Sequence, residues 1–118
     1  MRAVVTDPTG TPRLRLSEVP QPEPAPDQAL IRVEAFSLNA GEVRTALEAT
    51  ESYVPGWDFA GVIEAGAADG STPPKGTRVY GFVPQGAWAE YVVTPRSGCP
   101  RSLSRSSRPR RQRSRWPP

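Results

Sequence analysis

Proline and glycine interrupt this chain so often that only short structural elements fit between them. Fifteen prolines and ten glycines occur in 118 residues, and no uninterrupted apolar run exceeds four residues. A bilayer span needs about 20 apolar residues. Several segments between the breaks alternate apolar and polar residues, a pattern typical of the short strands of sandwiches and small barrels. The sequence therefore predicts a mainly β fold that fills at most one ordinary domain.

The charge of the chain changes abruptly at residue 96. Residues 1–95 carry seven Lys and Arg against twelve Asp and Glu, whereas residues 96–118 carry eight arginines and no acidic residue. The second segment is rich in serine and proline and has only three clearly apolar residues. These are too few to offset an ordering entropy of about 1–2 kcal/mol per residue. We therefore predict a structured domain over residues 1–95 and a disordered basic tail over residues 96–118.

Three interpretations of this tail compete. An arginine-rich segment neutralises phosphates, so the chain would be a non-enzymatic β-barrel module whose tail binds nucleic acid or an acidic partner. A membrane-surface helix is disfavoured, because four prolines in the tail leave no room for an apolar stripe. The composition also fits a frame-shifted or truncated reading of GC-rich coding DNA, which is the interpretation that we favour.

Six strands and one short helix are expected within residues 1–95. The first two strands are predicted to form a hairpin, and proline at every second position over residues 20–26 predicts a stiff connector after it. Val43, Ala46 and Leu47 are spaced as on a short helix. In the third strand, Ile31, Val33 and Ala35 are expected to face the core. The predicted strands cover residues 2–6, 14–16, 29–36, 59–65, 78–83 and 87–93.

Three blocks of sequence in register carry a resemblance to a known family. They are residues 37–44 (SLNAGEVR), 55–64 (PGWDFAGVIE) and 75–82 (KGTRVYGF), the last leading into residues 86–93 (GAWAEYVV). Their order and spacing resemble the N-terminal GroES-like domain of zinc-independent quinone oxidoreductases, within the medium-chain dehydrogenase/reductase superfamily. The resemblance covers residues 1 to about 95. It implies a GroES-like β barrel and NADP(H)-dependent reduction of a small-molecule quinone or enone, in a cleft shared with a Rossmann domain.

The cofactor half of that family pattern is missing from this sequence. The glycine-rich Gly-x-Gly-x-x-Gly turn that holds a dinucleotide does not occur. The chain is therefore interpreted as a truncated fragment of an NAD(P)H-dependent oxidoreductase that is inactive alone. A split enzyme, completed in trans by a separate Rossmann subunit, is a further possibility.

Zinc catalysis is not expected from these residues. The chain has no histidine and a single cysteine, Cys99, so it also lacks an internal disulfide. In the zinc-dependent relatives that the resemblance implies, a histidine ligand stands where this sequence has Trp57. The cysteine ligand expected in the segment matching residues 37–39 is absent. We predict no metal site.

Asn39 is the predicted catalytic residue, because the matching asparagine of the family lies at the nicotinamide end of the cofactor. Its amide offers two hydrogen-bond donors and one acceptor. Asn is equally a preferred helix N-cap, and Glu42 stands at the third helical position, so capping and function can coexist. Arg44, one turn further on, is a second cofactor-binding candidate. Its alternative role is an ion pair with Glu48 at i+4.

Tyr53 and Trp57 are candidates for an apolar wall of the substrate site, although core aromatics are the commoner explanation. Asp58 lies between two aromatic residues and is expected to need an arginine or a backbone partner, so it is interpreted as structural. No signal peptide is recognised, and we expect a soluble, cytoplasmic protein without membrane contact. Its exposed strand edges predict self-association.

Overall fold

The structure is a computed structural model that describes residues 1–98 and the backbone of residues 101–103. Most of the predicted basic tail lies outside these residues. The elements in chain order are β1 (Arg2–Thr6), β2 (Leu14–Glu18), β3 (Gln28–Ala35), α1 (Ala40–Leu47), β4 (Asp58–Ala65), β5 (Arg78–Phe82), β6 (Tyr91–Pro95), the 3-10 turn η1 (Arg96–Gly98) and β7 (Arg101–Leu103).

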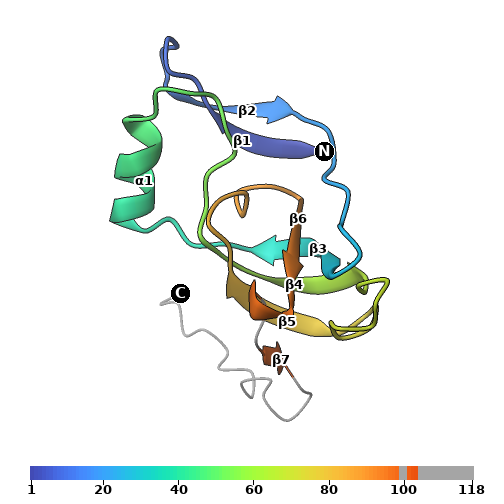
Figure 1. The fold of residues 1–118 in the computed structure, drawn as a ribbon. Coiled ribbons are helices and arrows are strands. Elements are labelled where there is room, and N and C mark those ends of the chain that lie inside the picture. Colours follow the sequence, from blue (N-terminus) through green and yellow to red (C-terminus); the bar gives the residue numbers. More distant parts are fainter. Residues whose placement is uncertain (99–100, 104–118) are drawn as a thin grey trace, which may run out of the picture.

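The strands form two antiparallel sheets. β1 and β2 make a two-stranded sheet, and the other strands make a five-stranded sheet in the order β6-β3-β4-β5-β7. Figure 1 shows the β1–β2 pair on one side of the curled larger sheet, with α1 beside both. The mainly β prediction with one short helix is confirmed, as is the N-terminal hairpin, in which Val4 lies opposite Leu16. No helix of the described residues is long and apolar enough to cross a membrane.

The core lies on the inner face of the larger sheet. Ile31, Ile63 and Val79 are completely buried there, and Val33 packs against the cluster, as the alternation in the third strand predicts. Ala35 is exposed instead of facing the core. The register between β3 and β4 shifts between Val33 and Ala35, and such an irregularity changes which side of the strand faces inward.

Two segments differ from their predicted secondary structure. The expected strand over residues 87–93 begins only at Tyr91, and the residues before it cross beneath the hairpin. There, Val4 N–H donates to the Trp88 carbonyl at 2.9 Å, and Ala3 forms an isolated bridge with Ala89. The larger sheet also continues past the predicted boundary at residue 95, because β7 pairs with β5. Buried residues 87–89 thus connect the two sheets instead of extending one of them.

Candidate functional site

The amino end of α1 begins at Asn39, the residue predicted to be catalytic. Asn39 is the N-cap, with extended backbone angles of φ −68° and ψ 146°. Its backbone N–H donates to Oε2 of Glu42 at 3.1 Å. The predicted capping role is therefore confirmed, and the carboxylate three residues into the helix supplies the acceptor. The side chain of Asn39 stays exposed.

Glu42 is a buried carboxylate that holds a second segment of the site. The residue is 2% exposed. Its Oε1 accepts the backbone N–H of Trp57 at 2.7 Å, while Oε2 is occupied by Asn39. The two oxygens thus bind the first turn of α1 to the loop that precedes β4. Sequence reasoning identified Glu42 only as a cap, because the Asn-x-x-Glu spacing carries no information about a residue fifteen positions away.

Ser37 and Asp58 form a hydrogen-bonded pair beside Asn39. Ser37 Oγ lies 2.6 and 2.7 Å from the two carboxylate oxygens of Asp58, and Ser37 N–H lies 3.3 Å from Oδ1. A carboxylate accepts only, so the Ser37 hydroxyl donates to it and is left to accept from Nδ2 of Asn39, at 3.2 Å. Asp58 therefore has the backbone partner that was predicted, and no arginine or lysine pairs with it among the described residues.

This arrangement orients the amide of Asn39. One of its N–H groups points to Ser37, and its Oδ1 faces the backbone N–H of Glu42 in the capping box, so the other N–H is the group available to a ligand among the described contacts. Ser37 itself is held from the other side, because Trp88 Nε1 donates to its carbonyl oxygen at 3.1 Å. Ser37 was missed at the sequence level. Its partner Asp58 is 21 residues away, so no local pattern predicts the pair.

Trp57 lies against the first turn of α1 and is 41% exposed. A side-chain carbon added at Gly41 would touch its ring at 3.6 Å, so the ring covers this glycine. The preceding Gly56 has φ +110°, and a Cβ there would lie 2.6 Å from Cδ1 of Trp88. Only glycine fits at that position. The loop thus holds the Trp57 ring against the first turn of α1, the turn that begins at Asn39.

The other two predicted site residues lie elsewhere. Arg44 is exposed on α1 and lines an open hollow with Leu38, Val43 and Leu47. The ion pair with Glu48 that was the alternative for Arg44 is not formed in the structure described. Among the described residues, no acidic side chain pairs with the guanidinium of Arg44, which lies on the helix that begins at Asn39.

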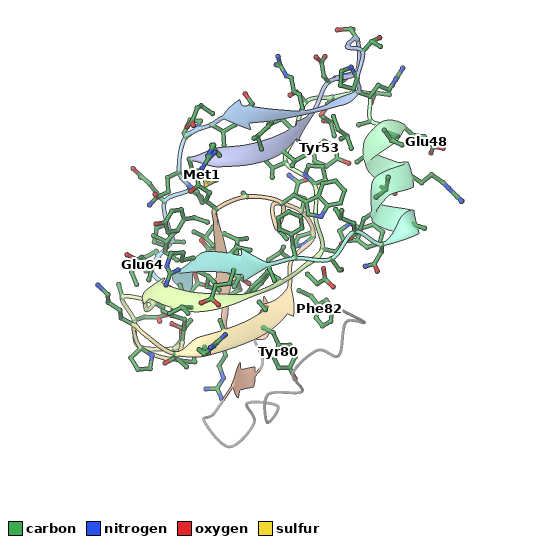
Figure 2. The ribbon with its side chains drawn as sticks, turned by 180° about the vertical axis from the view of Figure 1, so that it is seen from behind. Met1, Glu48, Tyr53, Glu64, Tyr80 and Phe82 are labelled. Atoms are coloured by element: carbon green, nitrogen blue, oxygen red, sulfur yellow. The ribbon has the colours of Figure 1, made fainter. Side chains whose placement is uncertain are left out.

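Tyr53 belongs to a different hollow from Trp57. Its backbone is attached to β1, because its N–H donates to Thr6 Oγ1 at 2.9 Å. The side chain lines a hollow of about 360 Å³ together with Val19, Pro20 and Tyr91, and this hollow includes neither Asn39 nor Trp57. Figure 2 shows Tyr53 close to the β1–β2 pair. The structure thus does not bring the two predicted substrate-wall residues together.

A third hollow, of about 380 Å³, opens beside the Ser37–Asp58 pair. Its aromatic lining residues are Phe36, Phe59, Tyr80 and Phe82. Figure 2 shows Tyr80 and Phe82 on the side of the sheet away from the hairpin. No group of three or more His, Cys, Asp or Glu side chains that would hold a metal ion occurs in the part of the chain that the structure describes.

The comparison with known proteins decides the family. Residues 25–102, about two thirds of the chain, match the alcohol dehydrogenase GroES-like domain. The chain belongs to that family. The match ends at residue 102, within β7, so the GroES-like domain extends past the boundary at residue 95 that the sequence predicted.

Two of the curated relatives of this GroES-like domain carry the names of a reductase and an oxidoreductase. The chain is 35% identical over 96 residues to the trans-enoyl reductase FMN2 of Fusarium mangiferae, a match that covers 79% of this chain and 25% of that protein. It is 38% identical over 101 residues to the human quinone oxidoreductase, covering 79% of this chain and 31% of the relative. The chain thus spans a quarter to a third of the length of these relatives.

Solved structures of two proteins superpose on most of this chain. The human synaptic vesicle membrane protein VAT-1 homolog-like protein superposes with a TM-score of 0.76 at 34% identity, over 84% of this chain and 34% of that one. The quinone oxidoreductase of Thermus thermophilus, whose structures include a complex with NADPH, superposes with a TM-score of 0.65 at 30% identity, over 84% and 31%. The resemblance to quinone oxidoreductases of the medium-chain dehydrogenase/reductase superfamily is thereby confirmed.

Proposed function

We propose that this GroES-like domain is the substrate-side part of an NADP(H)-dependent reductase of quinones or enones. In this proposal Asn39 donates a hydrogen bond to the oxygen on which negative charge develops when a conjugated carbonyl accepts a hydride. NADPH supplies that hydride when it is bound. A donor aimed at a developing oxyanion lowers the barrier most when it is already oriented before the reaction.

The orientation of Asn39 is the observation that carries the proposal. Its backbone is fixed by buried Glu42, and one side-chain N–H is engaged by Ser37, whose hydroxyl is fixed in turn by Asp58. The remaining N–H group is therefore held in one direction at an exposed position. The backbone of Trp57 is bonded to the same Glu42, and its side chain is 41% exposed. Its indole offers a flat apolar surface against which the ring of a substrate could stack.

The residues present fit one end of a nicotinamide cofactor and not the whole dinucleotide. Asn39 offers an amide hydrogen bond, and Arg44 offers a cation for a phosphate, since none of the ion pairs of the described residues involves it. The glycine-rich turn that would hold the pyrophosphate is absent from the sequence. We therefore propose that the chain alone binds NADP(H) weakly and reduces no quinone, and that the reaction of the complete site uses no zinc.

A chimaera tests this function. Residues 1–103 would replace the corresponding segment of the Thermus thermophilus quinone oxidoreductase, and NADPH-dependent quinone reduction would be measured. We expect activity in the chimaera and a loss of about 100-fold in kcat with Asn39→Ala, the usual magnitude for one oxyanion donor. Glu48→Ala on the same helix is the control and should leave kcat unchanged. A folded, active chimaera that tolerates Asn39→Ala refutes the role of Asn39.

The charge of the C-terminal segment favours a second candidate function, binding to nucleic acid. Eight arginines and no acidic residue over residues 96–118 contrast with a net charge of −5 over residues 1–95. Phosphate neutralisation makes such binding fall steeply with salt. Fluorescence anisotropy with a labelled single-stranded oligonucleotide should then show affinity that decreases linearly with salt on a double logarithmic plot. The absence of binding at about 50 mM salt, a concentration low enough for phosphate contacts to be strong, eliminates this candidate.

A further inference from the structure

Within the part of the chain that the structure describes, the outer edge of β2 in the β1–β2 sheet has no partner strand. β1 lies between β2 and the rest of the molecule, as Figure 1 shows. The inner edge of β1 is used, since Val4 N–H and Thr6 N–H donate to the carbonyls of Trp88 and Tyr53, both at 2.9 Å. Within the described residues no comparable bond is formed along the outer edge of β2. A complete row of backbone donors and acceptors is therefore available there.

The hairpin register determines which groups of β2 face outward. In an antiparallel pair, residues that exchange hydrogen bonds alternate with residues that do not. Val4 and Thr6 direct their N–H groups away from β2, so the residues opposite them do not bond to β1 either. Arg15 and Ser17 are the ones that bond to β1. The residues whose N–H and C=O groups face outward are Leu14, Leu16 and Glu18.

The edges of the larger sheet, β6 and the three-residue β7, are less complete templates than β2. β7 covers β5 from Arg78 to Tyr80. On the opposite side of the larger sheet, β6 ends in Pro95, which has no N–H to donate. Residues 14–18 of β2 contain no proline. Among the strands described, β2 is thus the most complete template for another strand.

We propose that a second copy of this chain pairs antiparallel with β2, with Leu16 opposite its counterpart on the two-fold axis. Hydrogen bonds form only in registers that oppose two outward-facing residues. The register centred on Leu16 uses all three outward residues of each copy. A shift of the register by two residues leaves Leu14 without a partner in one direction and Glu18 without a partner in the other. The shift that leaves Glu18 without a partner also places Arg15 opposite Arg15 of the second copy.

The side chains match this register. Leu16 is 67% exposed, more than any other large apolar residue of the described chain. It shares a face with Val4, its cross-strand neighbour, and both line an apolar hollow of about 300 Å³ that includes Phe36. The register places the two Leu16 side chains together and joins their apolar faces. A surface complementary to itself is what a two-fold dimer requires.

Sedimentation equilibrium of the full chain over a range of concentrations tests the dimer. We expect a monomer–dimer equilibrium, and Leu16→Lys should weaken it at least tenfold because two like charges then meet on the axis. Leu38→Lys is the matched control, since Leu38 is equally exposed at 65% but lies far along the chain from β2, next to α1. A monomer at every concentration overturns the proposal. So does a dimer that Leu16→Lys leaves intact, or one that both variants weaken equally.

The register has a separate signature that does not depend on a variant. In the proposed dimer Arg15 lies opposite Ser17 of the second copy in a pair without hydrogen bonds, with Cα atoms about 4.5 Å apart. Within one extended strand these two residues are about 7 Å apart. An isotope-filtered NMR experiment on a mixed labelled sample should show an intermolecular contact between their Hα protons. A dimer that lacks this contact uses another surface, and the proposal is then wrong.

Discussion

The amino end of α1 and the outer edge of β2 differ in how far their polar groups are hydrogen-bonded within the described chain. At the helix, both oxygens of buried Glu42 accept backbone N–H groups, and the hydroxyl of Ser37 both donates and accepts. At β2, three residues direct backbone donors and acceptors outward without a partner in the described chain. A substitution at the helix end therefore breaks existing hydrogen bonds. The outer edge of β2 can form new hydrogen bonds when another strand pairs with it.

This difference separates two kinds of function. Hydrogen bonds that are complete within the chain fix a side chain such as Asn39 in one orientation, and this is what a site for a small ligand needs. Unused backbone groups fix nothing by themselves but are complementary to any strand, and this is what an association surface needs. Substitutions in the helix region should therefore change stability, and substitutions on β2 should change association.

Gly56→Ala should be the largest disturbance of the helix region. The alanine backbone must adopt φ +110°, and its Cβ would lie 2.6 Å from Cδ1 of Trp88. We therefore expect a loss of about 3 kcal/mol or more in the free energy of unfolding. Urea denaturation measures it. Gly70→Ala is the control, because Gly70 also has positive φ, +77°, but has no atom within 4 Å of the added carbon. Equal losses in the two variants contradict a tight contact at Trp88.

Glu42→Gln should have an intermediate effect. The amide keeps one acceptor oxygen, so either the Asn39 or the Trp57 N–H loses its partner, at a cost of roughly 1–3 kcal/mol in the free energy of unfolding. Glu48→Gln, on the exposed surface of the same helix, should change stability by less than about 0.5 kcal/mol. If the two variants unfold at the same urea concentration, Glu42 does not join the helix to the Trp57 loop.

The smallest effect is expected outside both regions, at Asp69. The hydroxyl and then the backbone N–H of Ser71 hold the pKa of this carboxyl below its ordinary value. Because the folded pKa is depressed, the stabilisation is present above the unfolded pKa and is lost as the pH falls through the folded one. NMR titration should show the pKa of Asp69 rising in Ser71→Ala. An unchanged midpoint contradicts the hydrogen bond.

Local patterns predicted the local features of the fold. The alternation of β3 and the N-cap at Asn39 depend on residues within a few positions of one another, where sequence spacing translates directly into geometry. The hairpin was predicted from the turn residues between its two strands. The Arg44–Glu48 ion pair was equally local but was wrong. An exposed pair is worth little, so spacing alone does not enforce it.

The contacts that define the candidate site were beyond sequence reasoning. Ser37 meets Asp58 across 21 positions, and Glu42 meets Trp57 across 15. Both depend on how the chain turns between β3, α1 and β4, including the irregularity near Ala35. The separation of Tyr53 from Trp57 has the same origin, because the backbone of Tyr53 is bound to β1.

Amide hydrogen exchange of the full chain at two protein concentrations tests the contrast between the two regions most directly. The Trp57 N–H, bonded to buried Glu42, should exchange slowly and at the same rate at both concentrations. The Leu16 N–H should exchange rapidly in dilute solution and slowly in concentrated solution, where the dimer forms. Rapid exchange at Trp57, or exchange at Leu16 that does not depend on concentration, would contradict this account.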